Sequence, residues 1–256
     1  MVLVFVALNA ELHPIRARLA DRQALSNSDL NAYRGSISGV PVTLVVTGMG
    51  MRRSSISAAQ AMDSLTPIDF VVSAGVAGGL RDDLLVGQVV LSERLLTSRE
   101  DDFQPEQTIS APARWVGGFA NALGAAGIPY AAGSMMTVRR PIATAADKRR
   151  AHVQSGAISV DMESAVIALE AERRGLPFVC MRTILDSAGE DVVGARLVDQ
   201  DGRVRPLTAA RALITKPGTI IGAIRLTRNL RLSTYSLASA LEAVLPHAQI
   251  LADRQF

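Results

Sequence analysis

The stretch "SVDMESAVIALEAERRGLPFVCMRTILDSAGED", residues 159–191, decides the fold class of this chain. The segment "AISVDM", residues 157–162, predicts a strand, and residues 163–174 then have the composition of a helix. Gly175 and, two residues later, Pro177 are a usual signal for the end of a helix. The apolar run "PFVCMRTILD" that follows predicts a buried strand. The stretch therefore predicts a strand, a helix and a second strand in succession.

Carboxylates mark the ends of both of these strands. Asp161 and Glu163 close the first strand, and Asp186 closes the second one. Such a carboxylate is often only a helix cap, and a glycine at a strand end is often only a turn residue. Similar residues nevertheless follow three more predicted strands, at positions 9–11, 48–50 and 75–79. Because ligands bind at the carboxyl ends of strands in α/β sheets, we expect these residues to share one site.

Strands and helices alternate along the rest of the chain. The apolar run "VLVFVAL" at residues 2–8 is typical of a strand covered on both faces, and residues 31–48 predict a hairpin that turns at Ser38 and Gly39. We also expect helices over residues 11–24 and 113–126 and a loop over residues 96–112. This order favours an α/β protein, a single three-layer α/β/α domain with a mixed, mainly parallel central sheet.

The composition excludes several classes of protein. The chain has 27 Lys and Arg against 24 Asp and Glu, and a net charge of +3 is too small to argue for a nucleic-acid partner. The apolar start lacks a preceding basic region and is followed by Glu11, so we interpret it as a strand and not as a signal peptide. No apolar run is long enough to predict a membrane span, and the single Cys180 fits a reducing compartment such as the cytoplasm. No metal or cofactor is expected, since the three histidines, His13, His152 and His247, lack the spacing of metal ligands.

Three motifs carry a family resemblance. "SAGVAGGL" at residues 73–80, "VDMESAVIA" at 160–168 and "RTILDSA" at 182–188 resemble the signatures of the nucleoside phosphorylase and nucleosidase superfamily. That superfamily includes purine nucleoside phosphorylases and methylthioadenosine/S-adenosylhomocysteine nucleosidases, and the match in order and spacing covers roughly residues 1–190. The resemblance implies an enzyme that cleaves the N-glycosidic bond of a purine nucleoside, and it implies a homo-oligomer.

The resemblance also implies roles for the carboxylates. Glu163 would bind the ribose hydroxyls, because a carboxylate can accept two hydrogen bonds from a cis-diol, and Met162 would pack against the sugar. Asp186 would donate a proton to the purine N7 as the base departs, and burial would raise its pKa for that task. Glu11 would activate a water molecule. The other implied binding residues are Asp161, Gly75, Val76, Ala77, Gly78, Met135 and Met136, the two methionines near the position of a base-stacking aromatic residue.

Three departures from the pattern make the expected site more apolar than a methylthioadenosine enzyme needs. Leu185 stands where the nucleosidases have a serine that helps to orient the acid, and Val76 stands where they often have Ser or Thr. Methionine replaces the aromatic residue and gives a softer pocket wall.

The nucleophile stays open at the level of the sequence. Glu11 would repel a phosphate dianion, which favours water and hydrolysis. Gly50, Arg52 and Arg53, at the predicted start of a helix, are in contrast a candidate phosphate site, with phosphate as the co-substrate of a phosphorolysis.

The C-terminal region is basic. From Gly202 to Arg231 the chain has lysines and arginines but no acid, and part of this stretch is amphipathic as a helix. We therefore divide the single domain, residues 1–256, into a catalytic core, 1–200, and a basic helical extension, 201–256. The helix predicted in this extension can pack on the core. Alternatively, residues 203–231 can contact an anionic membrane surface.

The tail, in the form "G-R-x-R-P-L … K-P-G … R-x-x-R-N-L-R" over residues 202–231, resembles the hopanoid-associated phosphorylases of bacteria. That resemblance implies release of adenine from an adenosylated hopane lipid by a cytoplasmic enzyme, with peripheral contact at the inner face of the membrane. Two alternatives stay open: a methylthioadenosine/S-adenosylhomocysteine nucleosidase, and a non-catalytic nucleoside-binding or membrane-adaptor protein on the same fold.

Overall fold

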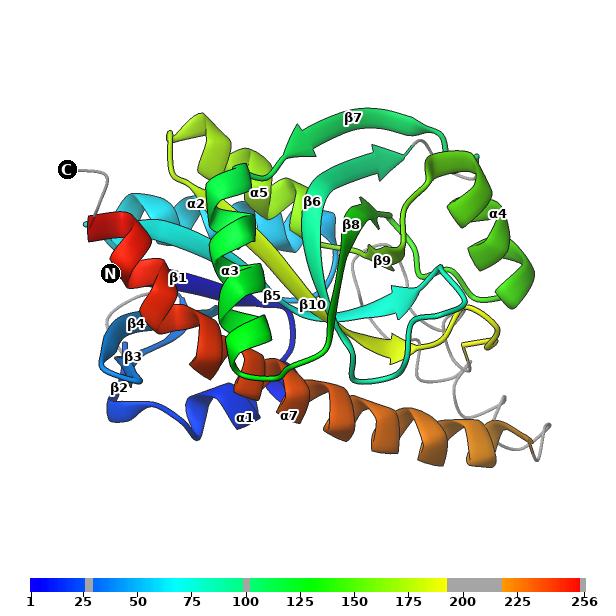
Figure 1. Ribbon diagram of the computed structural model, residues 1–256, viewed down its shortest axis with the longest axis horizontal. Helices are drawn as coiled ribbons and strands as arrows, with labels where there is room; N and C mark the ends of the chain where they lie inside the picture. The colour runs from blue at the N-terminus through cyan, green and yellow to red at the C-terminus, as the bar shows by residue number, and fades with distance from the viewer. Residues whose placement is uncertain (26–29, 99–101, 193–217, 254–256) are drawn as a thin grey trace.

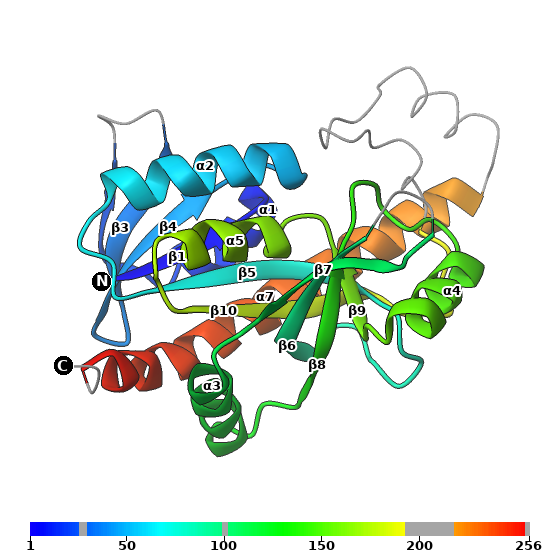
Figure 2. The same cartoon turned by 90° about the horizontal axis from the view of Figure 1, so that it is seen from above.

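The computed structural model describes residues 1–25, 30–98, 102–192 and 218–253, and it shows a mixed sheet with helices on both faces (Figures 1 and 2). The predicted α/β fold with a mixed central sheet is confirmed. The strands are β1 (Val2–Val6), β2 (Ala20–Ala24), β3 (Asn31–Ile37), β4 (Val40–Val46), β5 (Phe70–Gly79), β6 (Val89–Ser98), β7 (Pro105–Ser110), β8 (Tyr130–Thr137), β9 (Ser159–Asp161) and β10 (Phe178–Asp186). The helices are α1 (Asn9–Arg16), α2 (Met51–Ser64), α3 (Ala113–Ala125), α4 (Ala145–Ser155), α5 (Ser164–Arg173) and α7 (Gly218–Asp253).

The strands lie in the order β10-β6-β8-β9-β5-β1-β4-β3-β2, and β7 pairs with β6. Because β10 also pairs with β5, five of the described strands, β5, β10, β6, β8 and β9, close on one another. β1 pairs in parallel with β4 and β5, and β5 pairs in parallel with β10. The predicted hairpin is also present, since β3 and β4 are antiparallel and join through Ser38 and Gly39, both with positive φ. The carboxyl ends of the parallel strands therefore meet at one edge of the sheet.

The helices cover the two faces of the sheet in separate groups. α2 and α5 pack against each other on one face, and α3 packs against α7 on the other (Figure 2). α1 also packs against α7 (Figure 1). α4 lies apart from both groups, at the end of the molecule beside β9 (Figures 1 and 2).

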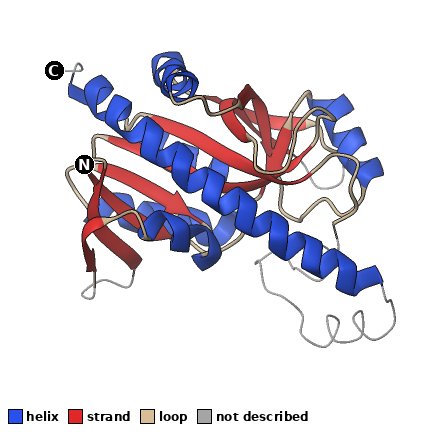
Figure 3. Cartoon of the chain, turned by 60° about the horizontal axis from the view of Figure 1, so that its bottom comes forward, coloured by secondary structure: helices blue, strands red, loops and turns tan. Residues whose placement is uncertain are grey.

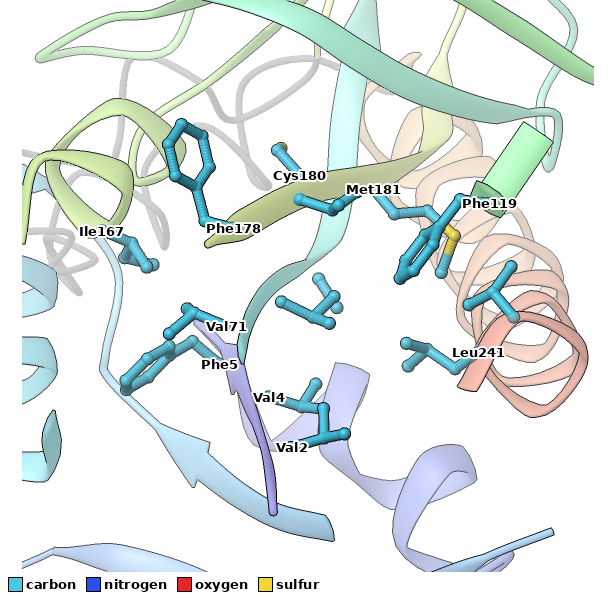
Figure 4. Close-up of a cluster of buried hydrophobic side chains, with 14 of the residues drawn as sticks. Val2, Val4, Phe5, Val71, Phe119, Ile167, Phe178, Cys180, Met181 and Leu241 are labelled. Carbon is cyan, nitrogen blue, oxygen red and sulfur yellow. The ribbon is translucent and has the colours of Figure 1, made fainter. Parts of the chain in front are cut away.

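The core is formed by apolar side chains from the inner strands. Phe5 and Val71 lie between Ile167 of α5 on one side and Phe119 and Leu241, of α3 and α7, on the other (Figure 4). Burial of apolar side chains such as these is a main favourable contribution to the stability of a fold. The core thereby fixes the strands whose ends carry the predicted site.

Two predicted elements are wrong. The helix expected over residues 11–24 ends at Arg16, and β2 follows it as an edge strand paired with β3. All five residues of β2 are exposed, so no alternation of apolar and polar residues signals the strand. The loop expected over residues 96–112 contains the end of β6 and the whole of β7, which is exposed except at Ile109. Both strands form because a neighbouring strand offers hydrogen-bond partners, and the sequence alone does not show that.

The C-terminal helix α7 belongs to the core along much of its length. Leu237, Leu241 and Val244 are fully buried on it, whereas Ile224 near its start is 65% exposed. Figure 3 shows that its first turns extend past the sheet. The larger part of the predicted contact region 203–231, up to residue 217, lies outside the described residues. Within the described part of the chain, no helix is both long and apolar enough to cross a membrane.

Candidate active site

A cavity of about 190 Å³ lies at the carboxyl ends of the parallel strands. Four acidic side chains reach it, from the segment after β1, from β9 and the residues that follow it, and from the end of β10. It is lined by Ala7, Leu8, Glu11, Met49, Val76, Ala77, Gly78, Val138, Pro141, Ile142, Lys148, Val160, Asp161, Met162, Glu163, Leu185, Asp186 and Val192. The structure thus brings together the strand ends that the sequence analysis singled out.

Glu11 is buried in the first turn of α1, and backbone amides hold both of its oxygens. Its Oε2 accepts hydrogen bonds from the N–H groups of Ala7 at 2.9 Å and Leu8 at 2.8 Å. Its Oε1 accepts one from the N–H of Val76 at 2.8 Å. Burial raises the pKa of Glu11, while the nearby Arg182 guanidinium and these amides oppose the rise. The carboxylate is therefore fixed in position and more basic than a carboxylate in water.

Arg182 lies opposite Glu11 on β10, in register with Gly75 of β5. A Cβ atom at Gly75 would lie 2.8 Å from Glu11 Oε1 and 3.1 Å from Arg182 Nη1, so the glycine leaves the space between them open. Arg182 Nη1 is buried, and it has no hydrogen-bond partner among the described residues. A buried donor and a buried carboxylate oxygen therefore converge on one small space, which suits a water molecule that donates to Glu11 and accepts from Arg182.

Asp161 holds this arginine in place. Arg182 Nε donates to Asp161 Oδ2 at 2.9 Å, and Thr137 Oγ1 donates to Asp161 Oδ1 at 2.7 Å. The N–H and the hydroxyl of Ser164 also donate to Asp161 Oδ2. Although one edge of Asp161 reaches the cavity, its carboxylate is occupied by these partners. These bonds give Asp161 a supporting role toward Arg182, and its expected contact with a substrate stays a prediction.

Glu163 is the third buried carboxylate that lines the cavity. Its Oε1 accepts a hydrogen bond from the N–H of Gly50 at 2.7 Å, and its side chain is buried beside Met162 in the cavity wall. Burial and, next, the charge of Asp161 raise the pKa of Glu163 to about 8. A carboxylate in this place can accept hydrogen bonds from hydroxyl groups of a ligand.

Asp186 lies at the other end of the cavity from Glu11 and is paired with Lys148 of α4. Lys148 Nζ donates to Asp186 Oδ2, and Lys148 is only 1% exposed. A register shift between Ile184 and Asp186 interrupts the pairing of β10 with β5 and turns the end of the strand toward the cavity. Burial raises the pKa of Asp186, and the ammonium group of Lys148 opposes the rise.

The other predicted residues separate into two groups. Val76, Ala77 and Gly78 line the cavity as predicted. Met135 and Met136 do not line it, because both are fully buried among apolar side chains, Met135 in the main core and Met136 in a second, smaller cluster. Their expected contact with the base is corrected accordingly.

The candidate phosphate site is not assembled in the cavity. The N–H of Gly50 is engaged by Glu163, while Arg52 and Arg53 are exposed on α2 and do not line the cavity. Within the described ranges, no group of three or more His, Cys, Asp and Glu side chains could hold a metal ion.

Sequence reasoning missed Arg182 and Lys148. An arginine inside the otherwise apolar strand "PFVCMRTILD" is a signal that could have identified the first of them. The second lies on α4, for which the sequence analysis predicted no element. The sequence "AADKRRAHVQS" has no apolar stripe, so nothing in it marks Lys148 as the buried cation.

A cavity lined by carboxylates at the strand ends of a mixed α/β sheet is the arrangement expected of a nucleoside-cleaving enzyme. The sequence profile of the phosphorylase superfamily matches residues 1–214, and the chain therefore belongs to that superfamily. This finding confirms the predicted superfamily and, with it, the prediction of an enzyme.

Curated relatives and solved structures agree with this assignment. The chain is 27% identical over 197 residues to a 5′-methylthioadenosine/S-adenosylhomocysteine nucleosidase of Geobacillus thermodenitrificans, over 72% of this chain and 83% of the relative. The fold is similar to that of the same kind of nucleosidase from Neisseria meningitidis, solved in complex with methylthio-immucillin-A, with a TM-score of 0.74 and 20% identity over 95% of this chain and 97% of the other. It is also similar to the futalosine hydrolase of Helicobacter pylori, with a TM-score of 0.73 and 16% identity over 96% and 97% of the two chains.

Proposed function

We propose that this protein hydrolyses the N-glycosidic bond of a purine nucleoside and releases the base. The observation that carries the proposal is that three buried carboxylates, Glu11, Asp186 and Glu163, line one cavity. Glycoside cleavage by two carboxyl groups needs an acid at the leaving group and a base at the nucleophile.

In this proposal the three carboxylates divide the work. Glu163 accepts hydrogen bonds from the ribose hydroxyls, which places the base beside Asp186 and the anomeric carbon, C1′, near Glu11. The bond between C1′ and the base breaks as the bond from the water oxygen to C1′ forms. Asp186 gives its proton to N7 of the departing base, and Glu11 takes a proton from the water. Both groups have raised pKa values because of burial, which suits an acid and a base near neutral pH.

Two features support water over phosphate as the nucleophile. The space between Glu11 and Arg182 is narrow, and a phosphate dianion there would meet the Glu11 carboxylate. The candidate phosphate site is also not available in the cavity. The N–H of Gly50 is engaged by Glu163, and Arg52 and Arg53 are exposed and do not line the cavity.

Apolar side chains support a substrate with an apolar group at the 5′ position of its ribose. Leu8, Met49, Val138, Ile142 and Val192 contribute most of the remaining wall. We propose an adenine nucleoside with a hydrophobic 5′ substituent, of which an adenosylated hopane-type lipid is the bulkiest candidate. A cytoplasmic enzyme with peripheral contact at the inner face of the membrane belongs to this proposal. The second candidate is 5′-methylthioadenosine or S-adenosylhomocysteine, on which the named relatives act.

The experiment follows adenine release from 5′-methylthioadenosine and from 5′-alkylthioadenosines of increasing chain length, each with and without phosphate. We expect release without phosphate, free ribosyl product instead of ribose 1-phosphate, and kcat/KM that rises with chain length. Strict dependence on phosphate would contradict hydrolysis. A constant kcat/KM along the series would favour the second candidate, and binding without release would leave only a nucleoside-binding protein.

A further inference from the structure

Lys148 is a buried lysine whose ammonium group is fully engaged by the protein. Its Nζ donates to Asp186 Oδ2, to the carbonyl of Ser187 at 2.7 Å and to the carbonyl of Glu190 at 3.0 Å. An ammonium group has three N–H donors, and these three acceptors use all of them. Lys148 lines the cavity but has no donor left for a ligand, so any effect that it has on a reaction passes through its partners.

Lys148 contacts one of the two carboxylate oxygens of Asp186. Among the described residues, the hydrogen-bond partner of the Asp186 carboxylate is Lys148, through Oδ2 alone. Oδ1 is therefore the oxygen left for a ligand. The preceding side chain, Leu185, lines the cavity but carries no polar atom that could orient the carboxylate.

The carbonyl partners of Lys148 lie in the segment that follows β10. This segment is also tied to α4 at other points, because the N–H of Ala145 donates to Asp191 Oδ1 at 2.8 Å and the N–H of Val192 donates to the carbonyl of Ala143 at 2.9 Å. Lys148 thus anchors Asp186 to the start of α4, which is itself held in place without it.

We propose that Lys148 is the positioning residue of the acid: it holds Asp186 Oδ2 so that Oδ1 faces N7 of the leaving base. The proposal rests on the function proposed above and assigns to a lysine of α4 the part for which the neighbouring Leu185 offers no group. It predicts that Lys148 matters for reactions that need an acid at the leaving group and matters little for those that do not.

The test compares two ribosides with different leaving groups in wild type and Lys148→Met, which keeps the length of the side chain. Adenine in 5′-methylthioadenosine needs a proton at N7, whereas the nitrophenolate of 4-nitrophenyl β-D-riboside leaves as a stable anion. We expect kcat for the adenine nucleoside to fall by about 10²-fold, the usual contribution of a positioned acid, and kcat for the nitrophenyl riboside to fall less than about threefold. Equal losses on the two substrates would overturn the inference and show a purely structural role.

Two controls separate positioning from folding. Arg149→Met removes a cation from the exposed face of the same helix, and Asp191→Ala removes another tie between the segment and α4. Neither should discriminate between the two leaving groups. If Lys148→Met does not fold, Lys148→Gln, which keeps a polar donor, takes its place in the same comparison.

Chemical rescue gives a second readout. In Lys148→Ala, added ethylammonium should restore adenine release in proportion to its concentration and leave the nitrophenyl reaction unchanged. Equal effects on the two reactions would count against the inference. A wild type that releases no base from any purine nucleoside would contradict the proposed function itself, and that result is separate from every outcome for the variants.

Discussion

Glu11 and Arg182 face each other across Gly75, and Asp186 faces Lys148 at the other end of the same cavity. At the scale of single residues, the site thus contains two polar pairs. Each pair lies behind an apolar wall, where the effective dielectric constant is low and a charge acts strongly on its neighbour. One variant below changes Asp186 itself, and the other changes Gly75, which lies beside both members of the other pair.

Asp186→Asn should abolish base release and leave nucleoside binding in place. Asparagine keeps the shape of the carboxyl group but supplies no acid proton, so kcat for an adenine nucleoside should fall by at least about 10²-fold. The change also leaves the buried Lys148 ammonium without its counter-charge, which should lower the free energy of unfolding. Activity is therefore measured well below the melting temperature of the variant. Adenine release within threefold of the wild-type rate would refute the role of Asp186.

Gly75→Ala should slow cleavage while the fold stays intact. The added Cβ would lie 2.8 Å from Glu11 Oε1, which three backbone amides hold in place, so the space proposed for the water closes. We expect a loss of about 10²-fold in kcat, the order found for small misplacements of reacting groups. Gly124→Ala is the matched control, because a Cβ there meets open space on α3 and should leave the rate unchanged. Similar rates for the two variants would rule out a nucleophile site at Gly75.

At the scale of elements, α7 has a packed part and an exposed part. Its second half packs on α1, α3 and β10, and its first turns extend beyond the sheet (Figure 3). Truncating the packed half would therefore expose the core.

Leu241→Ala should lower the free energy of unfolding by roughly 2–5 kcal/mol, the cost of a large-to-small change at a buried site. Leu241 is fully buried between α7 and the sheet. Ile224→Ala, on the exposed first turns of the same helix, should change stability by less than about 0.5 kcal/mol. Chemical denaturation of both variants gives the comparison. A small effect of Leu241→Ala would mean that α7 contributes little to the stability of the core.

At the scale of the whole molecule, the buried carboxylates make stability depend on pH. Burial raises the pKa of Glu163 from 4.5, its value in the unfolded state, to about 8 in the folded state. Between these two pH values, Glu163 keeps its proton in the folded state and loses it in the unfolded state. The favourable contribution of this proton binding to the free energy of unfolding is fully present below pH 4.5 and is lost as the pH rises through 8.

Glu163→Gln should therefore reduce the loss of stability between about pH 5 and pH 8, because glutamine does not ionise. Its amide oxygen can still accept the hydrogen bond from Gly50. The melting temperatures of wild type and variant are compared across this range, and the difference should grow in favour of the variant as the pH rises. Parallel curves would show that Glu163 does not carry the pH dependence. The same variant should bind ribosides more weakly and cleave them more slowly.

The exposed start of α7 supports the proposed membrane contact. Ile224, Leu232 and Tyr235 are at least half exposed there, beside Arg228 and Arg231, and Leu85 is exposed near Leu232 on the adjoining loop. Arg225 is already paired with Glu190, which reduces the contribution of Arg225 to attraction by an anionic membrane.

Changing Arg225, Arg228 and Arg231 together to Gln should lower co-sedimentation with anionic liposomes at low salt. Each basic residue near an anionic bilayer contributes about 1 kcal/mol, and salt weakens the attraction. Changing Arg34, Arg52 and Arg53 to Gln removes the same charge from other exposed positions and is the control. Equal pelleting of the two triple variants would exclude a specific basic surface on α7.

The sequence by itself determined the superfamily, the α/β fold and the strand ends that form the cavity. Apolar runs that end in glycine or acid are local signals, and Glu11, Glu163 and Asp186 were found from them. Edge strands β2 and β7 were missed, because their residues are polar and only a neighbouring strand makes them extended. The tertiary structure alone decided which charges pair. Asp161 binds Arg182 and Lys148 binds Asp186 across 21 and 38 residues of sequence, and no local pattern encodes such contacts. They form because burial removes water from these groups, so that each charge is stable only beside a partner that the fold brings to it.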